Sequence, residues 1–158
     1  MHKHKQTLFY IFLCSLLMIS ACVKKRQLET PISVMEEYIN IAMTAKASSD
    51  RSKLLELTTG NAYQELKGMS DKEFDEKFIQ SKFRFIAFKA KDLREENDGS
   101  LSLVYELSYE AKAEGNPATV TNKKIAYLGK DDSGHWKIKD TKNIKSLIES
   151  KNGLEVMK

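Results

Sequence analysis

The spacing of apolar residues changes near Lys82, and this change constrains the fold more than any other feature. Before Lys82, apolar residues recur three and four positions apart, as they do on one face of a helix. After it they alternate with polar residues, as in strands that bury one face. Helices followed by hairpin-connected strands predict an α+β domain, with N-terminal helices packed on an antiparallel sheet. The clearest alternation consists of Leu101, Leu103, Tyr105, Leu107, Tyr109 and Ala111.

Capping signals indicate where the helices begin. Thr30-Pro31 combines a capping hydroxyl with proline at the first helical position, so we expect a helix reaching about Ala47. Ser48-Ser49-Asp50 breaks this helix and starts a second, short one, after which further helical turns follow. Ser70-Asp71-Lys72-Glu73 is a capping box and predicts a helix reaching about Ser81.

Four strands are expected after the helices. Phe83–Phe88 begins as an alternation and shifts phase at Ile86, which predicts a bulged strand before the alternating strand at 101–111. A third strand is expected over 119–129, where the pattern leaves the inward face open. The turn at 131–134 then leads into a last strand that begins at His135-Trp136.

The C-terminal segment is expected to close the domain. Ile144, Leu147 and Ile148 have helical spacing and predict a short helix, and the residues after Asn152 are expected to fray. The predicted organisation is therefore one domain over residues 31–152, followed by a tail over residues 153–158.

The whole mature chain resembles the nuclear-transport-factor-two-like superfamily, and two segments carry the specific resemblance. One is the helix opening at Thr30-Pro31, which ends in a short Ser/Asp break, and the other is the segment Asp132–Asp140, with its Gly-His-Trp-Lys-Ile sequence. The resemblance implies a cone, in which the helices cover one face of a curved, four-stranded antiparallel sheet. It also implies a cavity between the two layers, whose expected lining is Tyr38, Phe78, Phe85, Tyr105 and Tyr109.

The N-terminus has the features of a secretory signal: a basic start, an apolar run over Leu8–Ile19 and small residues at its end. The alternative is a permanent transmembrane helix, which needs roughly 20 apolar residues, and this run is shorter. Ile19-Ser20-Ala21-Cys22 resembles the lipobox of bacterial lipoproteins. The resemblance implies cleavage between Ala21 and Cys22, a thioether-linked lipid on Cys22 and acylation of the new N-terminus. Labelling with palmitate detects such acyl chains.

The residues after Cys22 predict where the domain works. The lipidated cysteine and a short tether over 22–30 would hold the domain close to the membrane of the cell envelope. Lys24-Lys25-Arg26 would either attract anionic headgroups or remain a solvated tether. Val23, and not aspartate, follows Cys22. In a Gram-negative host this resembles the signal that sorts lipoproteins to the outer membrane, on its periplasmic face.

The mature domain offers few groups for catalysis. It has no thiol, because Cys14 is removed with the signal and Cys22 carries lipid. Enzymes of the resembled superfamily hold an acid–base group inside the cone, but His135 points opposite to Trp136 on its strand and is expected on the surface. We find no phosphate loop, zinc-ligand spacing or nucleophile elbow, so no cofactor or metal is expected. The acidic cluster at a predicted hairpin, which is interpreted as solvated, consists of Asp92, Glu95, Glu96 and Asp98.

The leading hypothesis is therefore a non-enzymatic binding or accessory module that acts near the membrane surface, with a small apolar ligand or a protein as its partner. One alternative is an isomerase- or dehydratase-like enzyme that uses the cone cavity. Another is an inhibitor or accessory subunit of an envelope complex, which would expose an apolar patch. Basic residues dominate after Lys112, but export makes nucleic acid an unexpected partner.

Overall fold

The computed structural model describes residues 30–80, 83–113, 116–150 and 153–157. The side chains of residues 112–117 and 154 are not described. A layer of helices precedes a five-stranded antiparallel sheet, so the molecule is an α+β protein as predicted. The signal segment, Cys22 and Lys24-Lys25-Arg26 lie outside the described residues, and the predictions made for them stay predictions. No helix among the described residues is long and apolar enough to cross a membrane.

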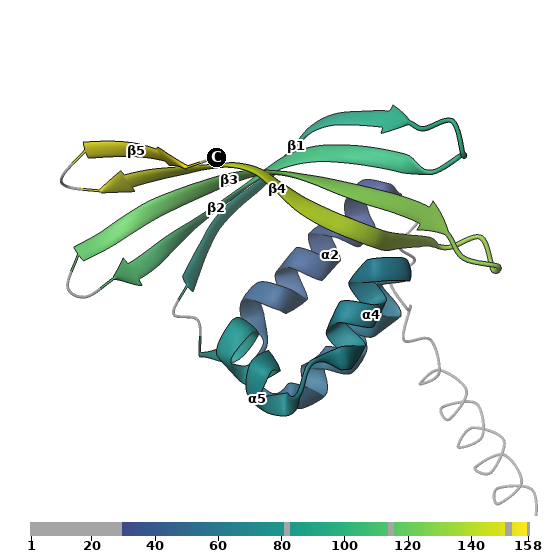
Figure 1. Ribbon diagram of the computed structural model, residues 1–158, viewed down its shortest axis with the longest axis horizontal. Coiled ribbons are helices and arrows are strands. Elements are labelled where there is room, and N and C mark those ends of the chain that lie inside the picture. The colour runs from purple at the N-terminus through teal and green to yellow at the C-terminus, as the bar shows by residue number, and fades with distance from the viewer. Residues whose placement is uncertain (1–29, 81–82, 114–115, 151–152, 158) are drawn as a thin grey trace, which may run out of the picture.

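The helical layer is a chain of short elements joined by tight connections (Figure 1). Most of them end within two turns, and only the first is longer than ten residues. Their bounds are α2 (Pro31–Thr44), η2 (Ser48–Asp50), α3 (Arg51–Glu56), α4 (Gly60–Gly68), α5 (Asp71–Phe74) and the π-helical turn η3 (Asp75–Ile79).

The predicted caps are present at both expected starts. Thr30 Oγ1 accepts a hydrogen bond from the Ser33 amide at 3.1 Å, and Ser33 Oγ accepts one from the Thr30 amide at 3.2 Å. Ser70 and Glu73 form the same reciprocal pair, with Glu73 N to Ser70 Oγ at 3.2 Å and Ser70 N to Glu73 Oε2 at 2.7 Å. These bonds satisfy amides that would otherwise lack partners at the helix N-termini. The predicted break is also present, because Asp50 Oδ2 accepts hydrogen bonds from the amides of residues 46 and 47.

The sheet has five strands in the sequential order β1-β2-β3-β4-β5, and every neighbouring pair is antiparallel. The expectation of four strands was therefore wrong, and the sheet is open rather than closed on itself. The strands are β1 (Phe83–Glu95), β2 (Leu101–Ala113), β3 (Asn116–Lys130), β4 (Trp136–Ser150) and β5 (Gly153–Met157).

Both C-terminal predictions were wrong, and a bulge in β4 accounts for the helix that was expected there. Lys124 pairs with Asn143 and Lys123 pairs with Lys145, so Ile144 is an extra residue in the ladder. A bulge shifts the side-chain phase of a strand, and this shift produced the three-residue spacing that resembles a helix. The segment continues as β4, and the expected frayed tail over residues 153–157 forms β5, which pairs with the end of β4.

The bulge predicted at Ile86 is confirmed. Phe85 pairs with Tyr109 and Ala87 with Ser108, which leaves Ile86 as the extra residue of β1. A second register shift follows between residues 90 and 92 of the same strand. Bulges at the edge of a sheet bend the strand and increase its twist, and β1 is an edge strand.

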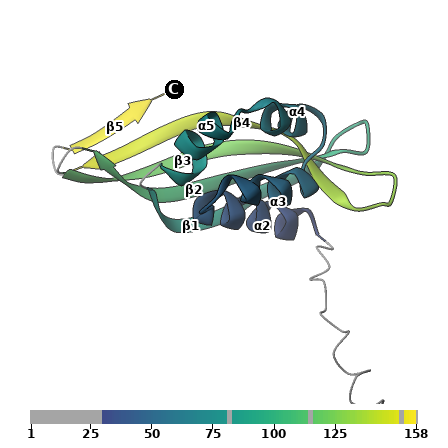
Figure 2. The ribbon, with the colours of Figure 1, turned by 90° about the horizontal axis from the view of Figure 1, so that it is seen from below.

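The helices all lie against one face of the sheet, which we call the inner face (Figures 1 and 2). Most of the core is formed where α2 meets the middle strands, and it includes Tyr105, which is 2% exposed. Burying each large apolar side chain contributes about 1.5–3 kcal/mol. The main cluster is Val34, Met35, Ile39, Leu103, Tyr105, Ala126, Leu128 and Ile138.

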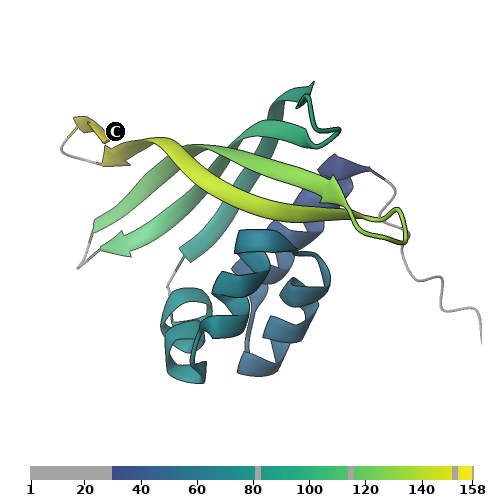
Figure 3. The same ribbon diagram turned by 45° about the vertical axis from the view of Figure 1, so that its right-hand side comes forward.

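A second cluster of buried side chains holds the short helices together as one layer. It consists of Leu54 from α3, Leu66 from α4 and Phe74 from α5. Two backbone hydrogen bonds tie this layer to β4: Thr59 N donates to Ile138 O at 2.8 Å, and Ile138 N donates to Leu57 O at 2.9 Å. In Figure 3, β4 runs above the helical layer and continues beyond it toward β5.

Candidate functional site

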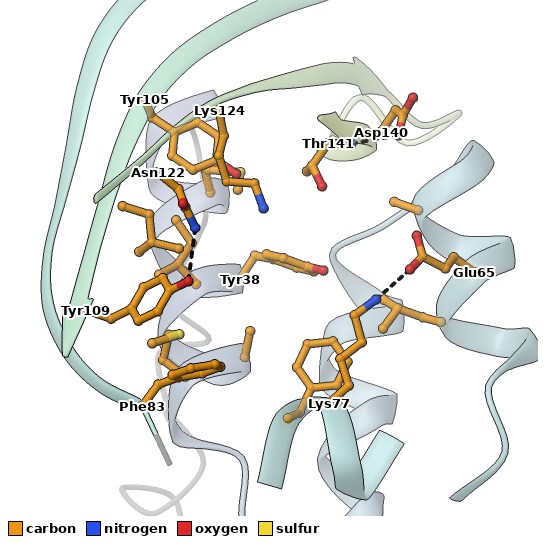
Figure 4. Close-up of a pocket in the computed structure, with 18 of the residues that line it drawn as sticks. Tyr38, Glu65, Lys77, Phe83, Tyr105, Tyr109, Asn122, Lys124, Asp140 and Thr141 are labelled. Carbon is orange, nitrogen blue, oxygen red and sulfur yellow. Dashed lines mark hydrogen bonds and ion pairs between the residues drawn. The ribbon is translucent and has the colours of Figure 1, made fainter. Parts of the chain in front are cut away.

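A cavity of about 300 Å³ lies between the helical layer and the inner face of the sheet (Figure 4). Its walls come from α2, α4 and η3 on one side and from β1, β2, β3 and β4 on the other. The volume is at the lower end of the range of small-molecule sites. The apolar part of the lining comprises Met35, Ile39, Ala42, Met43, Ala62, Leu66, Met69, Phe78, Phe83 and Leu107.

Tyrosines supply both aromatic surface and hydroxyls to this cavity. Tyr38 reaches in from α2, and Tyr105 and Tyr109 come from β2 (Figure 4). Burial, helped by the negative charge of Glu65, raises the pKa of Tyr38 to about 12. Burial, with a smaller contribution from Tyr38, also raises the pKa of Tyr105. Both phenols therefore stay protonated at physiological pH and can donate a hydrogen bond.

The hydroxyls of Tyr38 and Tyr105 have no hydrogen-bond partner among the described residues. Tyr109 differs, because its hydroxyl accepts a bond from Asn122 Nδ2 at 3.2 Å. The other amide atom, Asn122 Oδ1, is buried without a partner in the described part of the chain. A buried polar atom of this kind costs about 1–3 kcal/mol until something pairs with it. The cavity wall thus contains several unused hydrogen-bonding groups.

Lys124 is the unusual charge of the site. It lies on β3 opposite Tyr105, and its ammonium group points into the cavity (Figure 4). Burial is the main cause of the lowered pKa of Lys124; the positive charge of Lys77 adds to the effect and Glu65 partly opposes it. Within the described residues, Lys124 makes no hydrogen bond and no ion pair. Because a buried ammonium loses hydration, an unpaired one is a costly feature.

The acidic groups around the cavity are already engaged. Glu65 Oε1 lies 2.6 Å from Lys77 Nζ, in an ion pair that bridges α4 and η3 (Figure 4). Asp140 accepts the Thr141 amide at 2.8 Å and lies 3.7 Å from the ammonium of Lys142, and its carboxylate is directed away from the cavity (Figure 4). Lys124 therefore gives the cavity an excess of positive charge.

Four of the five residues expected to line a cavity do so: Tyr38, Phe78, Tyr105 and Tyr109. The exception is Phe85, which is absent from the lining. Its side chain is 45% exposed on β1, next to the bulge at Ile86. Phe85 pairs in register with the cavity-lining Tyr109, so alternation along β1 gave the correct face. The side chain is nevertheless exposed because β1 is the edge strand of the sheet.

Sequence reasoning missed the polar residues of the lining. Asn122 and Lys124 are on the inner phase of β3, together with the buried Ala126 and Leu128. The opposite phase contains Ile125 and Tyr127, so both faces of this strand are part apolar and part polar. Lys124 pairs with Tyr105, which points inward, and this pairing places Lys124 on the inner face of the sheet. The pairing can be known only from the register of the sheet.

The other candidates lie away from the cavity. His135 is exposed on the last hairpin, where its amide donates to Asp131 Oδ1 at 2.9 Å. In the acidic cluster, Asp92 pairs with Arg94 and Asp98 accepts from Ser100 in the hairpin turn. No group of three potential metal-ligating side chains occurs within the described ranges.

Comparisons with protein-family models, with curated proteins and with solved structures find no match to this chain.

Proposed function

We propose that this protein is a non-enzymatic binding module that holds a small, mostly apolar molecule between its helices and its sheet. The observation that carries the proposal is the cavity of about 300 Å³, with apolar walls and a few unpaired polar groups. This combination is typical of small-molecule sites, where apolar contacts supply affinity and polar groups set orientation.

The proposed place of action is a membrane surface of the bacterial envelope. The lipobox resemblance at Ile19-Ser20-Ala21-Cys22 and the short tether support it. In a Gram-negative host, Val23 favours the outer membrane. The proposed fold is a nuclear-transport-factor-two-like cone, an interpretation supported by helices on one face of an antiparallel sheet and by aromatic residues between the layers.

Isomerases and dehydratases of the resembled superfamily rely on a carboxylate or a histidine that is free to reach a ligand. The carboxylate of Glu65 is held by Lys77, that of Asp140 is directed away, and His135 is on an exposed hairpin. Binding without catalysis is therefore the better-supported function.

The cavity can be tested by filling it. Ala42 lines the cavity from α2, so Ala42→Phe should abolish binding of a small neutral apolar fluorophore such as naphthalene. Ala47→Phe, at an exposed position outside the lining, is the matched control and should bind as the wild type does. Equal binding by all three proteins would show that the fluorophore uses another surface and would overturn the proposal. Absence of binding to the wild type would count equally against it.

The anchor can be tested separately. Replacing Cys22 with serine should abolish palmitate labelling and release the domain from the membrane fraction. Unchanged labelling or fractionation of the Cys22→Ser protein would refute the lipoprotein assignment.

A second candidate is an accessory subunit that contacts an envelope protein, and it is favoured by one surface. The edge strand β1 exposes Phe83, Phe85, Ile86 and Leu93, each at 42–46%. A photo-crosslinking residue at Ile86 should then capture one specific protein in intact cells, and the same residue at exposed Lys72 on α5 should not. Absence of a specific adduct at Ile86 would exclude this candidate.

A further inference from the structure

Lys124 and its neighbours carry a more specific inference about what the cavity holds. We propose that the ligand is an amphipathic anion, an apolar chain or ring ending in one carboxylate, and that the carboxylate pairs with the ammonium group of Lys124. This inference rests on the proposed binding function and adds the chemical class of the ligand.

The first argument is charge. Lys124 projects into the cavity without a partner among the described residues, while Glu65, the acid whose charge acts on it, already contacts Lys77 at 2.6 Å. A half-buried ammonium without a counter-ion is unfavourable, and a ligand carboxylate would supply the missing charge. A neutral or cationic ligand would leave that cost in place or increase it.

The second argument is the type of hydrogen-bonding group around Lys124. The unused groups on the tyrosines are phenolic hydroxyls, and the raised pKa of Tyr38 keeps its hydroxyl protonated. An ionised carboxylate only accepts hydrogen bonds, whereas an ammonium and a phenol both donate them. The hydroxyl of Tyr38 and the ammonium of Lys124 both point into the same space in Figure 4. These donors suit an acceptor-only head group.

The third argument is size and the apolar wall. Met35, Leu66 and Phe78 surround the remaining space with aliphatic and aromatic surface. At about 30 Å³ for each heavy atom, as in liquid water, a cavity of this volume holds about ten such atoms. A medium-chain fatty acid fits this estimate, and a two-chain phospholipid does not.

The strand itself provides the control. Lys123 is the preceding residue, so its side chain points to the other face of β3, where it is exposed and pairs in register with Lys145. Lys123 and Lys124 carry the same charge one residue apart, and only Lys124 lines the cavity.

The test compares two ligands that differ only in the head group, decanoate and decanol, by isothermal titration calorimetry at neutral pH. The wild type should bind decanoate at least about tenfold more tightly than decanol. Lys124→Met should remove this preference and leave decanol affinity within about twofold, because methionine keeps the apolar stem and loses the charge. Lys124→Arg should retain the preference, and Lys123→Met should behave as the wild type does.

Equal binding of the two ligands by the wild type, or a preference that survives Lys124→Met, would overturn the inference. Binding of naphthalene checks that Lys124→Met keeps the cavity, and Lys124→Gln is the second variant if that check fails. If the wild type binds the neutral fluorophore and decanol but shows no preference for decanoate, the result contradicts only the inference that the ligand is an anion. Protein that binds none of the three contradicts the proposed function as well.

Discussion

Lys124 on the inner face of the sheet differs from the polar side chains of the outer face. On the outer face, polar side chains pair with one another across the strands: Lys91 Nζ lies 2.9 Å from Glu106 Oε2, and Ser108 Oγ lies 2.9 Å from Thr121 Oγ1. On the inner face, Lys124 has no partner in the described residues. Polar groups that pair across strands already have their hydrogen-bonding or charged partners, whereas unpaired groups beside a cavity are available to a ligand that enters it.

The inner face also carries the stability of the domain. Leu103 is fully buried under the helices, while the next residue, Val104, is only half-buried on the outer face. Leu103→Ala should therefore lower the free energy of unfolding by about 2–5 kcal/mol. Val104→Ala should cost about 1 kcal/mol or less, since less apolar surface is lost from the core. Urea denaturation of both variants measures the difference, and equal losses would mean that the two faces contribute alike.

A smaller effect of opposite sign is expected at Lys124. Lys124→Met removes a half-buried, unpaired charge and keeps an apolar stem, so it should raise the free energy of unfolding by up to about 1 kcal/mol. The gain is limited because water still reaches part of the side chain. Lys123→Met on the outer face should change stability by less than about 0.5 kcal/mol. Chemical denaturation without ligand decides this, and a loss of stability in Lys124→Met would show that the ammonium is well accommodated.

The stabilisation by Lys124→Met should depend on pH. The folded state lowers the pKa of Lys124, so between that value and the ordinary lysine value the unfolded chain binds more protons than the folded one. The wild type therefore recovers stability as pH rises through this window, and the advantage of Lys124→Met shrinks. Glu65, Lys77, Tyr38 and Tyr105 face the same cavity and are present in both proteins, so their titration cancels to first order in the comparison.

The corresponding measurement is the difference in unfolding free energy between the two proteins, from neutral pH to about pH 10. The same series with Lys123→Met is the control and should be flat. A constant difference between wild type and Lys124→Met at all pH values would contradict the assignment of the lowered pKa to this residue.

The smallest effect is expected for the paired charges of the outer face. Lys91 and Glu106 are both partly exposed, and such pairs contribute about 0.2–1 kcal/mol. A double-mutant cycle with Lys91→Met and Glu106→Gln should give a coupling energy in this range that falls at high salt. A coupling above about 2 kcal/mol would show that the outer face depends on its ion pairs as much as the inner face depends on packing.

Much of the fold was predictable because its signals are local. The helix starts at Thr30 and Ser70 are set by side chains three residues apart, and the strand at 101–111 by strict alternation. The bulge at Ile86 was also visible as a break in alternation. The bulge at Ile144 was not, because an extra residue in a strand produces the same spacing as a helical turn.

The site was predictable only in part. Tyrosines on a clearly alternating strand could be assigned to the interior, and Tyr105 and Tyr109 line the cavity as expected. Phe85 shares a face with Tyr109, but its exposure could not be predicted, because the position of β1 at the edge of the sheet is not a local signal. Lys124 could not be assigned either, because both faces of β3 mix apolar and polar residues.

The amino-acid sequence by itself determined that helices precede hairpin-connected strands, and it determined the helix caps and the inward face of β2, because each depends on residues only a few positions apart. The tertiary structure alone decided that Lys124 enters a cavity and Lys123 does not. That outcome depends on the register of β2 with β3 and on Tyr38, Glu65 and Lys77, which three separate helical segments bring to the same space. The pairing and the pKa of a charged side chain depend on the groups that surround it, and for Lys124 those groups are distant in the chain.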